Sequence, residues 1–277
     1  MATEAHLAFA PAKINLTLHV TGQRADGYHL LDSLVVFADL GDELRLQLAA
    51  EPALRVSGPM AAGVPVGADN LVLRAARLMG VTLDIALDKV LPAAAGIGGG
   101  SSDAAAVMRG AVALCPEVAL PADAGLSLGA DLPVCLMARA ARMSGIGEQV
   151  QAVPDMPDLH AVLVNPGVGV STAAIFGSLA RKDNAPMPQV LPRWTGAADL
   201  AAWLALQRND MQAAAVAFAP QIGDVLAALA QTRGCLLARM SGSGATCFGL
   251  YADADTARAA VPAVVQPGWW VRAVRLR

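Results

Sequence analysis

The glycine-rich segment Leu91–Ala106 constrains what this chain can fold into more than any other part of it. Four glycines, Gly96 and Gly98–Gly100, fall within five residues, and two serines and an alanine-rich helical stretch follow directly. Glycine lets backbone N–H groups converge on one point, because no Cβ obstructs the approach. The start of a helix adds further free N–H donors and the positive end of the helix dipole. The segment therefore predicts an anion cradle sized for a chain of phosphates.

The segment matches neither of the two common phosphate-binding glycine motifs. No lysine follows the glycines, so the G-x-x-x-x-G-K-[ST] loop is absent, and the residues after Gly96-Ile97-Gly98 depart from G-x-G-x-x-G. The alternative interpretation is a tight strand-to-helix turn capped by Ser101 or Ser102. A plain turn rarely requires so many glycines, so the phosphate cradle is favoured.

The composition of the 277 residues indicates a large buried core and excludes several classes of function. Hydrophobic residues make up 55% of the chain, charged residues make up 16%, and the mean hydropathy is +0.48, so a disordered chain is excluded. The net charge of −3 argues against nucleic acid as a partner. The longest uncharged stretch, 161–180, is interrupted by Asn165-Pro166-Gly167 and is too broken to span a bilayer. We expect neither a nucleic-acid nor a membrane partner.

The N-terminus and the cysteines indicate the compartment. MATEAHLAFAPAK has no basic segment ahead of an apolar one, so no signal peptide is expected. The four cysteines form no C-x-x-C pair and no zinc pattern with a nearby His. We therefore expect reduced, mostly buried thiols in a soluble, cytoplasmic protein.

Strands and helices mix along the whole chain. Apolar residues alternate over 14–20, which indicates a half-buried strand. Two further strands are expected over 34–40 and 43–48, joined by a turn at Gly41-Asp42. Residues 200–218 have the apolar spacing of one helix.

The order of these elements predicts the fold class and the domains. Strands and helices do not alternate with the regularity of a doubly wound sheet, so we predict an α+β fold in two lobes. The segment Val153–Asp158 contains two prolines and two acids and is the best linker candidate. The expected domains are therefore 1–153 and 154–277.

Two polar groups near the start and the middle of the chain suggest catalysis. Lys13 and Asn15 point to one face of their strand, where they could hold a phosphate and a hydroxyl. The alternative is an exposed polar strand face. Asp131 stands at a helix junction, where it could act as a general base beside a cation. The alternative is a helix N-cap, with Pro133 in the first turn.

Two further segments suggest ligand contacts. Met240–Phe248 is a second glycine turn with three hydroxyls, and a plain hairpin turn is its alternative. Tyr28 and His29 end a polar loop, where a ring face and an imidazole could hold a planar base. The alternative is a loop aromatic residue that covers the edge of the core.

The order and the amino-acid sequences of these segments resemble those of the GHMP kinase superfamily. The resemblance covers nearly the whole chain and rests on PAKINLTLHVTGQRADGYH, DNLVLRAARL, LPAAAGIGGGSSDAA, LGADLPV, GIGE and MSGSGATCF. The glycine loop is typical of the superfamily, and the N-terminal segment is similar to the members that act on 4-diphosphocytidyl-2-C-methyl-D-erythritol. The resemblance implies a two-lobe α+β fold with the active site in the cleft between the lobes.

The same resemblance implies a reaction and its residues. The γ-phosphoryl of ATP would pass to the 2-hydroxyl of that cytidine diphosphate acceptor, with Mg²⁺, in non-mevalonate isoprenoid biosynthesis. Asp131 would take the proton from the hydroxyl, and Lys13 would keep Asp131 ionised and steady the phosphoryl group. The expected ATP contacts are Asn70, Lys89, Pro92, Ala93, Ala94, Ala95, Gly96, Ile97, Gly98, Gly99, Gly100, Ser101 and Ser102. The expected acceptor contacts are Asn15, Tyr28, His29, Thr172, Phe176, Gly242 and Gly244.

Within that set, the rings of Tyr28 and Phe176 would sandwich the cytosine, and His29 would read its edge. Asp103 stands where some members carry Asn, so it is expected to act through the metal or to cap the helix. The metal ligands stay unassigned, and a monomer or a weak homodimer is expected.

Two alternatives to this function stay open. One is a GHMP kinase with a smaller acceptor, such as mevalonate or homoserine. Those acceptors carry no base, so the Tyr28-His29 loop argues against them. The other is a non-catalytic sensor that binds ATP and a ligand, against which the presence of both Lys13 and Asp131 argues.

Overall fold

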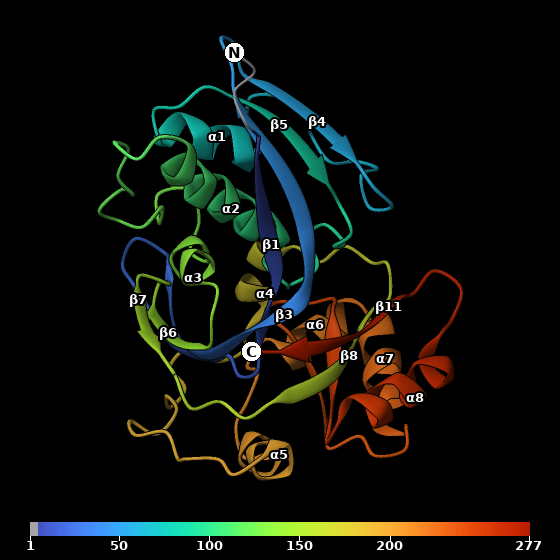
Figure 1. The fold of residues 1–277 in the computed structure, drawn as a ribbon. Helices are drawn as coiled ribbons and strands as arrows, with labels where there is room; N and C mark the ends of the chain where they lie inside the picture. The colour runs from blue at the N-terminus through green and yellow to red at the C-terminus, as the bar shows by residue number, and fades with distance from the viewer. Residues whose placement is uncertain (1–4) are drawn as a thin grey trace. The chain divides into compact units, whose positions relative to one another are not determined.

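The structure, a computed structural model, describes residues 5–277 and is an α+β fold, as predicted (Figure 1). Two compact units are interleaved in sequence. Unit 1 comprises residues up to 13, 40–93 and 98–138, and unit 2 comprises 14–39, 94–97 and 139–277. Because the chain passes several times between the units, they define no single boundary, and the domain boundary placed after residue 153 stays a prediction.

Unit 1 is a small sheet covered by helices. It contains most of β1 (His6–Asn15), the second half of β3 (His29–Leu48), β4 (Ala53–Ser57) and β5 (Leu83–Asp88). Strand β5 pairs antiparallel with β3 and parallel with β4. The helix α2 (Gly99–Leu114) packs against α1 (Leu71–Leu78) and α3 (Leu132–Met137), and Figure 1 shows the three helices on one side of the strands. The apolar faces of these elements form the core of unit 1.

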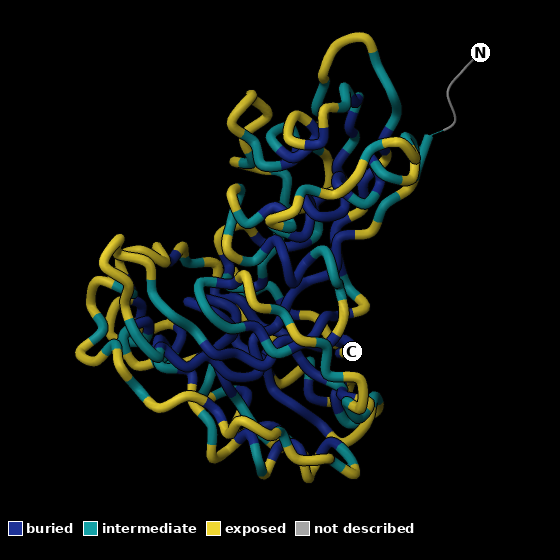
Figure 2. Tube along the Cα trace, turned by 90° about the vertical axis from the view of Figure 1, so that its left-hand side faces the viewer, coloured by how far each residue is buried: buried dark blue, intermediate teal, exposed yellow. Residues whose placement is uncertain are grey.

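Unit 2 is built on an antiparallel sheet in the order β11–β8–β10–β9. Its strands are β2 (His19–Gln23), the first half of β3, β6 (Ala141–Gly145), β7 (Gln149–Ala152), β8 (Leu159–Asn165), β9 (Leu237–Met240), β10 (Cys247–Tyr251) and β11 (Trp270–Leu276). Its helices are α4 (Thr172–Ser178), α5 (Ala197–Ala205), α6 (Gln212–Phe218), α7 (Gln221–Ala230) and α8 (Ala254–Val264). A core that includes Leu18, Val164, Ile222 and Cys247 lies between sheet and helices. Figure 2 shows the buried segments inside and the exposed segments mainly in loops.

The turn predicted at Gly41-Asp42 is wrong, because β3 runs through both residues without a break. A Cβ on Gly41 would lie 2.3 Å from the carbonyl oxygen of Ala10. The glycine is therefore required by the close approach of the backbones of β1 and β3, and not by a turn. Asp42 is fully buried, and its Oδ1 accepts hydrogen bonds from the N–H groups of Val90 and Leu91.

The helix predicted over 200–218 is two helices, α5 and α6. Asn209 lies between them and is buried, and its Nδ2 donates to the carbonyl oxygens of Met240 and Gly242. The chain leaves the helical path there because this side chain satisfies the backbone of a distant turn. The strand predicted over 14–20 is likewise divided between β1 and β2.

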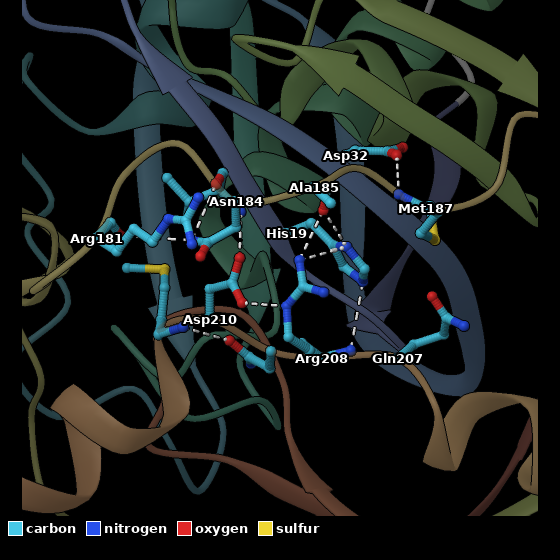
Figure 3. Close-up of polar contacts among 12 residues, drawn as sticks. His19, Asp32, Arg181, Asn184, Ala185, Met187, Gln207, Arg208 and Asp210 are labelled. Atoms are coloured by element: carbon cyan, nitrogen blue, oxygen red, sulfur yellow. Dashed lines mark hydrogen bonds and ion pairs between the residues drawn. The ribbon is translucent and has the colours of Figure 1, made fainter.

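The segment 181–189 has no regular secondary structure, but buried polar side chains hold it in place (Figure 3). The carboxylate of Asp32 accepts from the N–H of Met187 at 2.8 Å. A ring nitrogen of His19, Nδ1, lies 3.1 Å from the carbonyl oxygen of Ala185. Burial lowers the pKa of His19, so the ring is neutral at pH 7. These contacts fix the path of the segment along β2 and β3.

Among the described residues, no helix combines the length and the apolar character that crossing a bilayer requires.

Candidate functional site

The glycine loop enters α2 without any side-chain cap. Gly98 is the N-cap residue, with a φ of 63° in the left-handed region, and it makes no side-chain capping hydrogen bond because a glycine has no side chain. The alternative of a serine-capped turn is therefore wrong for Ser102, whose buried hydroxyl donates to the carbonyl oxygen of Pro11 at 2.6 Å. Uncapped N–H groups and the positive helix end form a ready site for a phosphate.

Lys13 and Asp131 form an ion pair against this loop. The Nζ of Lys13 lies 3.0 Å from Oδ2 of Asp131, and the side chains are 4% and 31% exposed. A Cβ on Gly98 would lie 3.1 Å from Cε of Lys13 and 3.7 Å from Oδ2 of Asp131. The cation and the carboxylate therefore lie beside the residue at which α2 begins.

Asp131 occupies the N-cap position of α3, but its carboxylate makes no capping hydrogen bond. Pro133 lies in the first turn of that helix, as the capping alternative expected. The helix starts without help from the carboxylate, which is instead paired with Lys13 and partly open to solvent. This arrangement suits a general base beside a fixed positive charge.

The loop also packs on the second glycine turn, within unit 2. The hydroxyl of Ser241 donates to the carbonyl oxygen of Gly96 at 2.9 Å. A Cβ on Gly96 would lie 2.4 Å from the carbonyl oxygen of Ser241, and one on Gly242 would lie 2.7 Å from the carbonyl oxygen of Gly96. Both glycines are thus required by close backbone packing. Thr172 joins α4 to this turn through a 2.7 Å contact between its Oγ1 and Oγ of Ser243.

Asn15 is buried in unit 2. Its Nδ2 donates to Oγ of Ser33 at 2.8 Å, and its backbone N–H donates to Oγ of Ser241 at 3.0 Å. The backbone bond ties the end of β1 to the second glycine turn. The expected contact between Asn15 and an acceptor stays a prediction.

The three aromatic residues expected at the cytosine lie in unit 2, and the sandwich of the base between Tyr28 and Phe176 stays a prediction. His29, and not Tyr28, stacks on Phe176, with the ring centroids 4.2 Å apart and the planes at 10°. Tyr28 is 58% exposed. Burial and the nearby charge of Lys182 lower the pKa of His29, and its Nε2 is buried with no hydrogen-bond partner among the described residues. One face of Phe176 is therefore already covered by a neutral imidazole that has an unused nitrogen.

Two of the expected ATP contacts, Asn70 and Lys89, have roles inside unit 1. Asn70 caps α1, because its Oδ1 accepts from the N–H of Val72 at 3.0 Å. Its Nδ2 donates to the carbonyl oxygen of Pro65. Lys89 is buried and its ammonium pairs with Asp42 and Asp103. Their expected contacts with ATP stay predictions.

Asp103 is not a helix cap, because the N-cap of α2 is Gly98 and the Asp103 carboxylate binds Lys89. Sequence reasoning missed Asp42, which it placed in a turn, and Ser241, which it counted only as part of the second glycine turn. The available signal for a buried ion pair was that Asp42 stands in the run 34–42, which is apolar apart from Asp39 and Asp42.

Replacing Gly98 with Ala should reduce kcat/KM for ATP by about tenfold to a hundredfold, because small displacements of catalytic groups carry losses of that size. The new Cβ would require a left-handed backbone and would press on the stem of Lys13. The matched control is Gly129→Ala, whose Cβ would make only ordinary contacts at 3.9 Å and 4.0 Å. Steady-state kinetics of both variants decide the matter. A Gly98→Ala enzyme with wild-type kcat/KM would show that this glycine does not position Lys13.

Comparison with known proteins gives the class that this fold and site define. Two family models match the chain: GHMP kinases N terminal domain over residues 70–139, and GHMP kinases C terminal over residues 191–268. A homoserine kinase structure from Cytophaga hutchinsonii shares the fold at a TM-score of 0.64 and 18% identity, covering 98% of this chain and 94% of its own. The protein is an ATP-dependent small-molecule kinase of the GHMP class, as the resemblance implied.

Relatives with much higher identity narrow the class. A protein of Cereibacter sphaeroides is 56% identical over 97% of this chain and 98% of its own, and one of Dinoroseobacter shibae is 58% identical over 97% and 94%. A solved structure of 4-(cytidine 5'-diphospho)-2C-methyl-D-erythritol kinase matches with a TM-score of 0.79 and 33% identity, over 98% of this chain and 99% of its own. Both curated relatives are named 4-diphosphocytidyl-2-C-methyl-D-erythritol kinase, and the chain belongs to that family.

Proposed function

We propose that the protein transfers the γ-phosphoryl of ATP to the 2-hydroxyl of 4-diphosphocytidyl-2-C-methyl-D-erythritol and releases ADP, as a step of isoprenoid biosynthesis. The observation that carries the proposal is the 3.0 Å pair of Lys13 and Asp131 beside the uncapped start of α2. A phosphoryl transfer enzyme needs a base for the acceptor, a cation for the developing charge and donors for the phosphates. The names of the relatives supply the acceptor.

In the proposed mechanism, the N–H groups at the start of α2 and the glycine loop hold the triphosphate. Asp131 accepts the proton of the attacking hydroxyl, and its side chain is exposed enough to be reached from solvent. The buried ammonium of Lys13 keeps the carboxylate ionised in the ground state. It also stabilises the negative charge that spreads over the transferring phosphoryl oxygens. The pair thus combines base and electrostatic roles in one contact.

Magnesium in this proposal comes with the nucleotide. Among residues 5–277, no group of three or more His, Cys, Asp or Glu side chains could hold a metal ion. Mg²⁺ usually binds through one or two carboxylates together with substrate phosphates, and keeps several waters. We therefore treat the ion as part of a MgATP substrate, in which it neutralises phosphate charge.

We also propose that the protein works in the cytoplasm as a monomer or a weak homodimer. The four cysteines are free thiols in the structure, which suits a reducing compartment. Light scattering over a range of protein concentrations measures the oligomeric state, and a stable higher assembly would contradict this part.

Recognition of the acceptor base is assigned to Tyr28, His29 and Phe176. Removing one aromatic ring should raise KM for the cytidine acceptor by about tenfold, since stacking on a base is worth roughly 1–3 kcal/mol and about 1.4 kcal/mol is a factor of ten. Phe176→Ala should have at least the effect of Tyr28→Ala, because it also releases the stacked ring of His29. The KM for ATP should stay within about twofold in both variants.

The matched control for these variants is Phe218→Ala, which removes a 57% exposed ring from α6 and should change neither KM. Equal effects on both substrates in Tyr28→Ala and Phe176→Ala would remove the base-binding role. The kinase would then have an unknown acceptor.

The position of the transferred phosphate tests the proposed reaction directly. The 2-hydroxyl is on a tertiary carbon, so the new phosphorus should show no coupling to a hydrogen on its carbinol carbon in phosphorus NMR. A phosphate on a primary or secondary hydroxyl would show that coupling and would contradict the proposed regiochemistry. Formation of one ADP for each product confirms the phosphoryl donor.

A further inference from the structure

A buried cluster of one ammonium and two carboxylates lies in unit 1, outside the pair assigned to chemistry. The Nζ of Lys89 is 2.5 Å from Oδ2 of Asp42 and 2.8 Å from Oδ2 of Asp103. The three side chains are 5%, 0% and 4% exposed. The ammonium is therefore enclosed by its own carboxylates and has almost no surface through which to reach a ligand.

The cluster connects three elements next to the phosphate cradle. Asp42 belongs to β3, Lys89 follows β5, and Asp103 lies in the second turn of α2. The Oδ1 of Asp42 also accepts from the N–H groups of Val90 and Leu91, the two residues that lead into the glycine loop. These contacts fix both the entry to the loop and the helix that leaves it.

The ammonium also lies close to the first residue of α2. A Cβ on Gly99 would be 3.5 Å from Nζ of Lys89. The N–H groups of this first turn are the ones left without a side-chain cap. A shift of Lys89 would therefore move the donors that receive the phosphates.

Stability alone gives little reason for such a cluster. Replacing a buried ion pair with apolar residues of similar volume is often neutral or stabilising, because the desolvation cost of the charges is large. Burial raises the pKa of Asp103 to about 7 against the opposing charge of Lys89. Burial by itself would lower the pKa of Lys89, but the charges of Asp103 and Asp42 outweigh it and leave that pKa raised. The ammonium thus stays charged, and burial disfavours the charged form of the Asp103 carboxylate in α2.

We propose that Lys89 is a positioning residue for the nucleotide: held between Asp42 and Asp103, it fixes the start of α2 at the phosphates and does not itself bind ATP. The proposal rests on the assignment of the glycine loop to ATP, as in the proposed function. It concerns the nucleotide alone, so it does not depend on which acceptor is phosphorylated.

The first test compares two substitutions of Asp103, measured as the dissociation constant of a non-hydrolysable ATP analogue by calorimetry. Asp103→Asn keeps an oxygen that can accept from Lys89 and should bind the analogue within about threefold of wild type. Asp103→Ala removes the connection between Lys89 and α2 and should weaken binding by about tenfold, which corresponds to about 1.4 kcal/mol. The matched control is Asp84→Asn, a carboxylate of β5 paired with the exposed Arg55. It should bind the analogue as wild type does.

A double-variant cycle separates positioning from direct contact. Lys89→Met alone leaves two buried carboxylates without their cation and should weaken analogue binding by about tenfold or more. Adding Asp103→Asn removes one of those charges and should restore at least about threefold of the loss, so the two effects are not additive. If Lys89 instead contacts the nucleotide, the double variant should bind no better than Lys89→Met.

Melting temperature serves as the second readout. A purely structural role predicts a lower melting temperature with an unchanged dissociation constant in the folded protein, and that result would overturn the proposal. Equal binding by Asp103→Ala and Asp103→Asn would overturn it as well, and this comparison remains decisive if Lys89→Met does not fold. Absence of analogue binding to the wild-type protein would instead refute the assignment of the loop to ATP.

Discussion

Asp131→Asn should lower kcat by about 10²–10⁴ while MgATP and the acceptor still bind, because general bases contribute rate factors of that size. The substitution is nearly isosteric, and its amide oxygen can still accept from Lys13 at the observed 3.0 Å separation. The start of α3 should be unaffected, since the carboxylate makes no capping hydrogen bond there. The loss should therefore appear in turnover rather than in folding. Single-turnover rates and melting curves measure the two separately.

The control for this variant is Asp123→Asn, an exposed carboxylate earlier in unit 1. Its oxygens accept from the N–H groups of Gly125 and Ser127, which hold its pKa below the usual value. An Asn can keep part of that turn, so activity should be near wild type. If Asp131→Asn keeps more than about a tenth of the wild-type rate, the loss is smaller than that expected of a general base. Asp131 would then be only the N-cap residue of α3.

Lys13→Met should lower kcat by about 10²–10³, the loss expected when one donor to the developing negative charge is removed. Methionine preserves most of the buried stem that lies against Gly98, so the loop should keep its shape. Asp131 is partly exposed, so water can solvate it after the cation is lost, and the fold should survive. The expected signature is a fall in kcat that exceeds any change in the KM for ATP.

Arg258→Met is a suitable control for Lys13→Met, because it removes an exposed cation that pairs with the neighbouring Asp255 in α8. An unchanged kcat with a raised KM for ATP in Lys13→Met would mean that the lysine binds substrate and transition state equally. Its role would then be ground-state binding.

The parts of the site that could be predicted from sequence are those set by local chemistry. Four glycines before an alanine-rich helix can form few structures other than an open helix start, and the structure has one with Gly98 as its N-cap. The pairing of Lys13 with Asp131 was expected from the family resemblance, and the structure brings their charged atoms within 3.0 Å.

The parts that could not be predicted depend on residues far apart in the chain. Considered without the rest of the chain, Gly41 indicates a turn. In the fold, its lack of a Cβ allows the backbone of Ala10 to approach closely. The break between α5 and α6 follows from hydrogen bonds of Asn209 to a turn more than thirty residues away. Short-range patterns carry no information about such partners.

Two residues of the candidate site also have partners that could not be predicted from the sequence. Lys89 precedes the loop and was expected to bind ATP, but its charge is satisfied by Asp42 in a distant strand. The ring that stacks on Phe176 is that of His29, while Tyr28 is exposed to solvent. In both cases the neighbour depends on the fold and could not be predicted from the sequence.

The choice of acceptor tests the account most directly. The purified protein would be incubated with MgATP and one acceptor at a time: 4-diphosphocytidyl-2-C-methyl-D-erythritol, mevalonate or homoserine. Mass spectrometry would detect any phosphorylated product. We expect that only the cytidine diphosphate acceptor gains one phosphate, with an equal amount of ADP formed. A phosphorylated mevalonate or homoserine, or no product from any of the three, would contradict it.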